Sequence, residues 1–166
     1  MKIFVDMDGV IYPWNKEVDP RLLWTKIYYE NMPAEQDMIS TLDEYKEKAE
    51  LFVLSCYLND EAKAGKNAAL DKLGGLFPAD HRIFVPYGKN KAEYAEKVIG
   101  QKLDQNCILF DDHSPNCLSW QEAGGRAVKI LNDINGKGEI WKGERMYRDG
   151  TVPSKSILPT SRLILS

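Results

Sequence analysis

Four aspartates are the residues of this chain with the clearest capacity for chemistry. Asp6 and Asp8 follow its first apolar run, and Asp111 and Asp112 follow its fourth. Parallel sheets bind ligands at the carboxyl ends of their strands, so acids in these positions are expected to converge. Converging carboxylates repel one another unless a cation lies among them, and hard oxygen ligands favour Mg²⁺. We therefore expect these four aspartates to form a Mg²⁺ site.

The spacing of Asp6 and Asp8 provides a nucleophile and a proton carrier at one centre. A metal-shielded aspartate can attack phosphorus and form an aspartyl-phosphate, which water then cleaves. A second carboxylate two residues on suits proton transfer, and Gly9 lets the chain turn so that both acids face one pocket. We predict that Asp6 is the nucleophile, and that Asp8 protonates the leaving oxygen and then activates water.

Ser55, Cys56 and Lys91 are the candidates for binding phosphate. Ser55 follows the second apolar run, where its hydroxyl and the neighbouring backbone amides, that of Cys56 included, would hold phosphate oxygens. Lys91 opens a helical segment and would neutralise charge at phosphorus, with Lys89 as a competing candidate. Alone, each has a simpler explanation as a helix cap or a solvated lysine, but their order along the chain indicates one site. Catalysis by the Cys56 thiol is excluded, because a cysteine phosphatase needs an arginine where this chain has Ala62.

The elements that must position these residues alternate along the chain. Short apolar runs are typical of buried strands, and the segments between them have helical spacing and helix-start signals at Asn59-Asp60, Asn90 and Ser114-Pro115. Strands are expected at 2–6, 50–54, 82–85, 107–110 and 127–130, and helices at about 60–73, 90–101 and 115–123. This alternation predicts an α/β fold in which helices cover both faces of a parallel sheet.

The stretch 14–48 interrupts that alternation. Two helical patterns follow each other there without a strand between them, the first opening at Asp19-Pro20 and the second near Pro33-Ala34. We interpret residues 14–48 as a small helical cap inserted into a core made of residues 1–13 and 49–166.

The last part of the chain has weaker signals. Residues 135–138 are polar and rich in glycine, and residues 139–147 indicate a small hairpin or an ordered loop. The final residues, which include Pro153 and Pro159, predict an irregular surface tail.

Composition indicates one folded domain. The 166 residues are 43% hydrophobic and 28% charged, and no apolar run could span a bilayer. Asp6 interrupts the stretch that a signal peptide would need, so we expect a cytoplasmic protein. Three cysteines without a Cys-x-x-Cys spacing indicate reduced thiols. The net charge of −3, with only a mild basic excess in residues 121–166, disfavours a nucleic-acid polymer as partner.

Taken together and in order, these motifs resemble those of the haloacid dehalogenase (HAD) superfamily. They are Phe4-Val5-Asp6-Met7-Asp8-Gly9-Val10, Leu51-Phe52-Val53-Leu54-Ser55, Lys91, and Ile108-Leu109-Phe110-Asp111-Asp112. The resemblance covers about residues 2–131. It implies a Rossmann-like core with a cap after the first strand, a nucleophilic Asp6 and an acid/base Asp8. It also implies Mg²⁺ held by Asp6, the backbone carbonyl of Asp8 and the Asp111-Asp112 motif.

Within the superfamily the chain looks most like the 5'(3')-deoxyribonucleotidases. The resemblance lies in residues 6–10 followed by a helical insertion, in residues 111–116 followed by Trp120, and in residues 128–132, Asn135 and 141–143. It implies a nucleoside monophosphate as substrate, and the family name indicates the deoxy series. The short insertion leaves room for another small phosphomonoester, such as a sugar phosphate, as the alternative.

Aromatic residues near the predicted site are candidates for contacting the substrate. Trp14, Trp24, Tyr28 and Tyr57 could stack on a base, a contact of about 1–3 kcal/mol. Trp24 and Tyr28 lie four residues apart, so packing between helices explains them without a ligand, and Trp14, which follows the nucleophile loop directly, is the better candidate.

Two functions of other classes use similar residues. A signalling receiver domain also accepts phosphate on an aspartate, but it would have its acidic pair on the first strand, whereas here the pair follows the fourth. A module that binds nucleotides without turnover is the other alternative, and the full set of catalytic side-chain types disfavours it.

Overall fold

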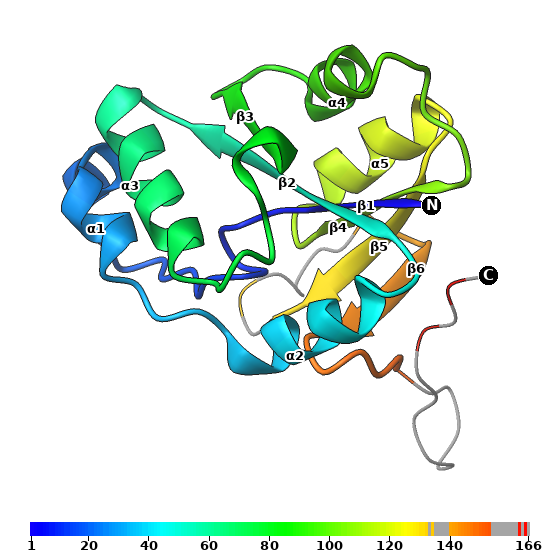
Figure 1. Ribbon diagram of the computed structural model, residues 1–166, viewed down its shortest axis with the longest axis horizontal. Helices are drawn as coiled ribbons and strands as arrows, with labels where there is room; N and C mark the ends of the chain where they lie inside the picture. The colour runs from blue at the N-terminus through cyan, green and yellow to red at the C-terminus, as the bar shows by residue number, and fades with distance from the viewer. Residues whose placement is uncertain (133, 135–139, 154–162, 164, 166) are drawn as a thin grey trace.

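The computed structural model describes residues 1–132, 134, 140–153, 163 and 165, and its centre is one parallel sheet (Figure 1). The strands, in the spatial order β3-β2-β1-β4-β5-β6, all run parallel to their neighbours. Their bounds are β1 Lys2–Val5, β2 Glu50–Tyr57, β3 Arg82–Pro86, β4 Cys107–Asp111, β5 Arg126–Leu131 and β6 Glu144–Tyr147. The predicted parallel α/β fold is confirmed.

Helices connect the first five strands and cover both faces of the sheet (Figure 1). They are α1 Lys26–Glu30, α2 Gln36–Tyr45, α3 Asp60–Asp71, α4 Lys91–Ile99 and α5 Ser114–Glu122, with 3₁₀ turns η1 Pro20–Trp24 and η2 Ala79–His81. Two of the expected start signals act as caps, because the side chains of Asn59 and Asn90 accept hydrogen bonds from the backbone at Ala62 and Ala92.

Alternation along β1 divides the core into two layers. Ile3 and Val5 pack in one cluster with residues of α2 and α3, whereas Phe4 packs in the other with residues of α4 and α5. The sheet is therefore buried on both sides, and the carboxyl ends of its strands remain as the place for a site.

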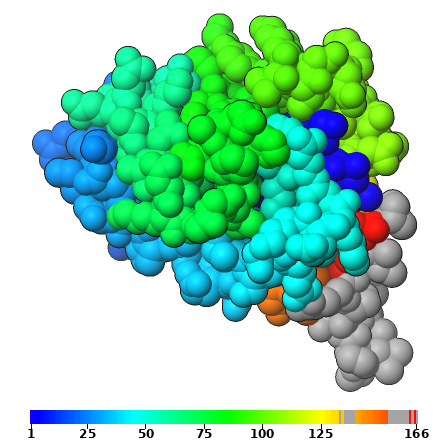
Figure 2. All heavy atoms as spheres, viewed as in Figure 1, coloured from blue at the N-terminus to red at the C-terminus, as the bar shows by residue number. Residues whose placement is uncertain are grey.

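The segment predicted as a cap has two different environments. α1 packs on α3, closely enough that a Cβ on Gly65 would lie 2.4 Å from the carbonyl oxygen of Lys26. Figure 2 shows the region of α1, in blue, against α3 at one end of the molecule. In contrast, α2 contributes Met38 and Leu42 to the core cluster beneath the sheet. The division into a cap at 14–48 and a core stays a prediction.

The hairpin or ordered loop expected at 139–147 is wrong for the residues that the structure describes there. β6 instead adds a parallel strand beside β5, with Val128 paired to Glu144 and Leu131 to Tyr147. A hairpin needs antiparallel strands and a short turn. Here β5 and β6 are parallel, and parallel neighbours need a longer connection that brings the chain back to the end of the sheet at which β5 begins. The glycine-rich segment 135–138 and the part of the tail around Pro159 lie outside the described residues.

In the described ranges, no helix has both the length and the apolar character needed to cross a membrane.

Replacing Trp120 should show how much the α4–α5 layer contributes to stability. Its ring is fully buried against Phe4, at a centroid distance of 4.9 Å, and its Nε1 donates to the carbonyl of Cys107. We expect Trp120→Ala to lower the free energy of unfolding by about 3–5 kcal/mol, measured by urea denaturation. Val98→Ala on the exposed side of α4 is the control and should change it by less than about 0.5 kcal/mol. Equal effects of the two would contradict this packing.

Candidate active site

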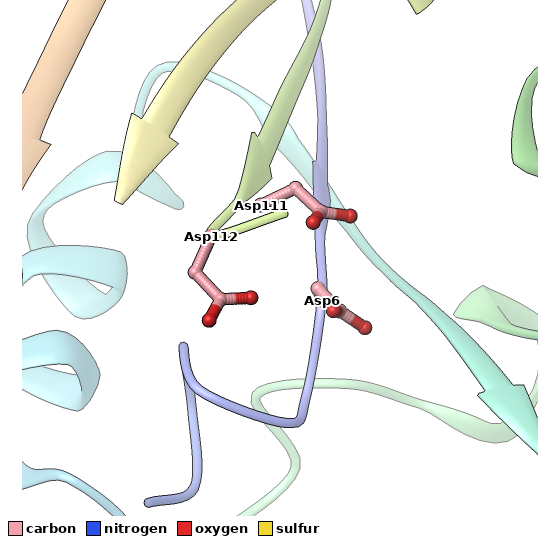
Figure 3. A group of neighbouring side chains, drawn as sticks. All are labelled: Asp6, Asp111 and Asp112. Atoms are coloured by element: carbon pink, nitrogen blue, oxygen red, sulfur yellow. The ribbon is translucent and has the colours of Figure 1, made fainter. Parts of the chain in front are cut away.

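Three of the four predicted aspartates converge at the carboxyl ends of adjacent strands (Figure 3). Asp6 follows β1. Asp111 is the last residue of β4, and Asp112 follows it. β4 pairs with β1 up to Val5 and Phe110. One carboxylate oxygen from each of the three lies within 4.8 Å of the others, and all three residues are buried. The apolar strands thus bring Asp6 together with two acids that lie more than a hundred residues later in the chain.

Lys91 lies between two of these acids. Its Nζ is 2.9 Å from Oδ1 of Asp6 and 2.7 Å from Oδ2 of Asp111. Burial of the ammonium opposes its charge, but the two carboxylates outweigh that effect and raise the pKa of Lys91. Lys89, the competing candidate, is exposed where it lines the pocket. The geometry therefore favours Lys91 as the cation at the acidic cluster.

The acidic pair is held in place by amides that come from later elements. Asp111 accepts hydrogen bonds from the backbone of His113 and from Nδ2 of Asn116. Oδ2 of Asp112 accepts one from Nδ2 of Asn132 at 2.7 Å, and the same amide nitrogen lies 3.0 Å from the carbonyl oxygen of Gly9. Asn132 thus connects the acidic pair with the loop after β1.

The three converging acids fit a small divalent cation. Burial, followed by the charges of Asp6 and Asp111, raises the pKa of Asp112 to about 7. Like charges this close in a buried place are unfavourable, and a hard cation such as Mg²⁺ is the partner that oxygen donors prefer. These residues could therefore hold Mg²⁺.

Asp8 faces a different partner. Its Oδ2 lies 2.5 Å from Nζ of Lys66, and its side chain is not part of the three-acid group found among the described residues. Lys66, on α3, also donates to Oγ of Ser55 and to the carbonyl of Cys56. Ser55 and Cys56 lie inside β2, which continues to Tyr57, beyond the strand end expected at residue 54. Burial raises the pKa of the Cys56 thiol.

Lys66 was not among the residues predicted from the sequence. It lies on the face of α3 that carries Ala62, Ala69 and Leu70, and all four side chains are buried. A lysine within the apolar stripe of a predicted helix is the signal that could have indicated it, because lysine is almost never buried without a partner. Asn116 and Asn132 were also missed, although both belong to segments quoted for the family resemblance.

The site opens into a pocket of about 760 Å³. Of the four aromatic residues predicted to contact substrate, Trp14 and Tyr57 line it. Trp24 and Tyr28 are not among its lining residues; Trp24 is half exposed, and Tyr28 packs edge-on against Tyr29. Further lining residues that the sequence did not single out are Lys16, Leu23, Tyr29, Leu58, Tyr87, Gly88 and Ile134.

Solved structures share this architecture at low sequence identity. A HAD-superfamily hydrolase from Ehrlichia chaffeensis matches with a TM-score of 0.57 and 15% identity, covering 80% of this chain and 88% of its own. A D,D-heptose 1.7-bisphosphate phosphatase from B. bronchiseptica, complexed with magnesium and phosphate, matches with 0.61 and 14%, covering 87% and 90%. This chain has the fold of a HAD-superfamily hydrolase. A hydrolase from Pseudomonas syringae adds a match with a TM-score of 0.59 and 14% identity, covering 89% of this chain and 93% of its own.

Structural similarity thus confirms the HAD fold. No family model and no curated protein matches the sequence. At these identities the solved structures establish the fold, and the activity must be argued from the residues of the site.

The loop after β1 allows a direct test of the metal site through Gly9. This residue has a φ of +79°, and a Cβ there would lie 2.3 Å from Oδ2 of Asp112. We expect Gly9→Ala to displace that carboxylate and to weaken Mg²⁺ binding by about 10-fold or more, measured by calorimetry. Gly74→Ala is the matched control, since Gly74 has a φ of +62° but no atom within 4 Å of an added Cβ. It should lose stability without losing Mg²⁺ affinity, and equal affinities in both variants would contradict the assignment.

Proposed function

We propose that this protein is a Mg²⁺-dependent phosphomonoester hydrolase that forms an aspartyl-phosphate on Asp6. The observation that carries the proposal is the convergence of Asp6, Asp111 and Asp112 on one strand edge, with Lys91 bridging the first two. Burying a cluster of like charges lowers the free energy of unfolding, so its presence in this structure supports a functional role.

The proposed reaction has two displacements at phosphorus. A carboxylate oxygen of Asp6 forms a bond to phosphorus as the bond to the leaving oxygen breaks, and Asp8 gives its proton to that oxygen. The Asp8 carboxylate then takes a proton from water as the water oxygen attacks phosphorus. The bond to Asp6 breaks, inorganic phosphate leaves, and both carboxyl groups return to their first state.

Other residues would hold the phosphoryl group and the metal. Lys91, together with the hydroxyl of Ser55 and the backbone at Cys56, would bind phosphate oxygens. The carboxylates of Asp6 and of the Asp111-Asp112 pair, with the backbone carbonyl of Asp8, would hold Mg²⁺. When bound, Mg²⁺ supplies charge neutralisation between the nucleophile and the phosphate oxygens. The phosphatase from B. bronchiseptica, complexed with magnesium and phosphate, supports this pair of ligands for the fold.

We propose a nucleoside monophosphate as substrate, which would make the protein a 5'(3')-deoxyribonucleotidase. We propose the cytoplasm as its location. Trp14 and Tyr57 line the pocket beside the acidic cluster and offer aromatic faces to a base. Trp14 lies at the start of the proposed cap. A sugar phosphate is the second candidate, because the matched phosphatase from B. bronchiseptica is named for a heptose bisphosphate.

Replacing Asp6 tests the nucleophile. We expect Asp6→Asn to abolish Mg²⁺-dependent release of phosphate from deoxynucleoside monophosphates while the circular dichroism spectrum stays unchanged, because an amide does not attack phosphorus at a useful rate. Asp37→Asn, at an exposed position of α2, is the control and should keep full activity. Full activity of the Asp6→Asn protein would refute the assignment. Binding without turnover in the wild type would favour the nucleotide-binding module instead.

A substrate panel combined with Trp14 variants tests the nucleotidase assignment. We expect deoxynucleoside 5'- and 3'-monophosphates to be better substrates than sugar phosphates, judged by kcat/KM. Trp14→Ala should raise KM for the nucleotides by about 10-fold, the equivalent of one lost stacking contact, and leave that for sugar phosphates unchanged. Trp14→Phe keeps an aromatic face and should restore most of the loss. Equal or better turnover of sugar phosphates by the wild type would remove the nucleotidase assignment.

A further inference from the structure

We infer that Lys66 is a positioning residue for proton transfer, because it fixes the carboxylate of Asp8 and stabilises the negative charge that forms there when the proton leaves. This inference rests on the proposed function and adds to it a residue that none of the four motifs contains. It is carried by the contacts of two side chains, Lys66 and Asp8.

Lys66 uses its whole ammonium group at this site. Its Nζ donates to Oδ2 of Asp8 at 2.5 Å, to Oγ of Ser55 at 2.9 Å and to the carbonyl of Cys56 at 2.7 Å. An ammonium group has three protons, so these acceptors engage all of them and fix its position. The side chain is only 1% exposed, and Nζ lies 4.8 Å from the ring centroid of Tyr29, which belongs to α1.

The carboxylate of Asp8 depends on this one contact. Its Oδ2 is bound by Lys66, whereas its Oδ1 is buried and has no hydrogen-bond partner in the part of the chain that the structure describes. The other acids of the site are held differently, since Asp6 accepts a bond from the backbone of Met7 and Asp112 accepts one from Asn132. Lys66 is therefore the residue that determines where the Asp8 carboxylate lies.

The same cation also orients the serine of the phosphate site. Because Oγ of the fully buried Ser55 accepts a hydrogen bond from Lys66, its own proton is directed away from Nζ. Asp8 and Ser55 are thus set relative to each other by a single group. During the reaction Lys66 keeps its three protons; the proton that moves to the leaving oxygen comes from the Asp8 carboxyl group.

The dependence of rate on the leaving group distinguishes this role from a structural one. A deoxynucleoside 5'-monophosphate has a poor leaving group that needs a proton, whereas p-nitrophenyl phosphate has a good one that needs little help. We expect Lys66→Met to lower kcat/KM for the nucleotide on the order of 100-fold, the size of one acid–base contribution, and for p-nitrophenyl phosphate by less than about 5-fold. Asp8→Asn should show the same selective loss.

Two controls accompany these measurements. Lys97→Met, at an exposed position of α4, should leave kcat/KM for both substrates unchanged. The affinity of the Lys66→Met protein for Mg²⁺, measured by calorimetry, should match that of the wild type, because the three converging acids do not contact Lys66 in the described structure. Equal losses for both substrates, or no loss for either, would overturn the inference.

A double variant covers the case in which Lys66→Met leaves too much buried charge for the protein to fold. Combining it with Asp8→Asn removes both charges, and if Lys66 acts through Asp8 the combination should cost less than about 3-fold beyond Asp8→Asn alone for the nucleotide. A larger further loss would overturn the inference. If the wild type releases phosphate from neither substrate, the proposed function itself fails, which is a separate result.

Discussion

Repulsion between carboxylates at one end of the sheet is the constraint on which the rest of the site depends. Asp6, Asp111 and Asp112 are buried within a few ångströms of one another, and Asp8 lies close by on the same loop. Two buried lysines, Lys91 from α4 and Lys66 from α3, pair with these acids and offset part of that charge. A bound Mg²⁺ would neutralise more of it, which would couple metal binding to the local fold.

The loop after β1 is held by segments that come much later in the chain. The carbonyl of Gly9 accepts hydrogen bonds from Asn132, after β5, and from Arg148, after β6. Arg148 also lies 3.4 Å from Glu35, which precedes α2. The strands at one edge of the sheet therefore contribute to the geometry of a site that lies near its middle, because their ends supply the donors that fix the nucleophile loop.

Local sequence patterns were sufficient to predict the first five strands of the sheet and insufficient to predict its edge strand β6. β1, β2, β4 and β5 are mostly buried apolar runs, and β3 carries buried Ile83 and Val85 at alternate positions, so all five are recognisable without tertiary information. β6 is a four-residue strand with only Met146 buried, so its sequence resembles a loop or half of a hairpin. Its pairing is decided by the exposed edge of β5 rather than by its own pattern.

The sequence by itself determined that acids follow the first and fourth strands and that a lysine opens the helix before the fourth strand. Strand ends and helix starts are set by neighbouring residues. It also predicted a candidate nucleophile and a fold, and the fold was confirmed. Only the tertiary structure decided that Asp8 pairs with Lys66 while Asp6 pairs with Lys91. Which cation meets which carboxylate depends on how α3 and α4 pack against the sheet, and packing is a property of the whole chain.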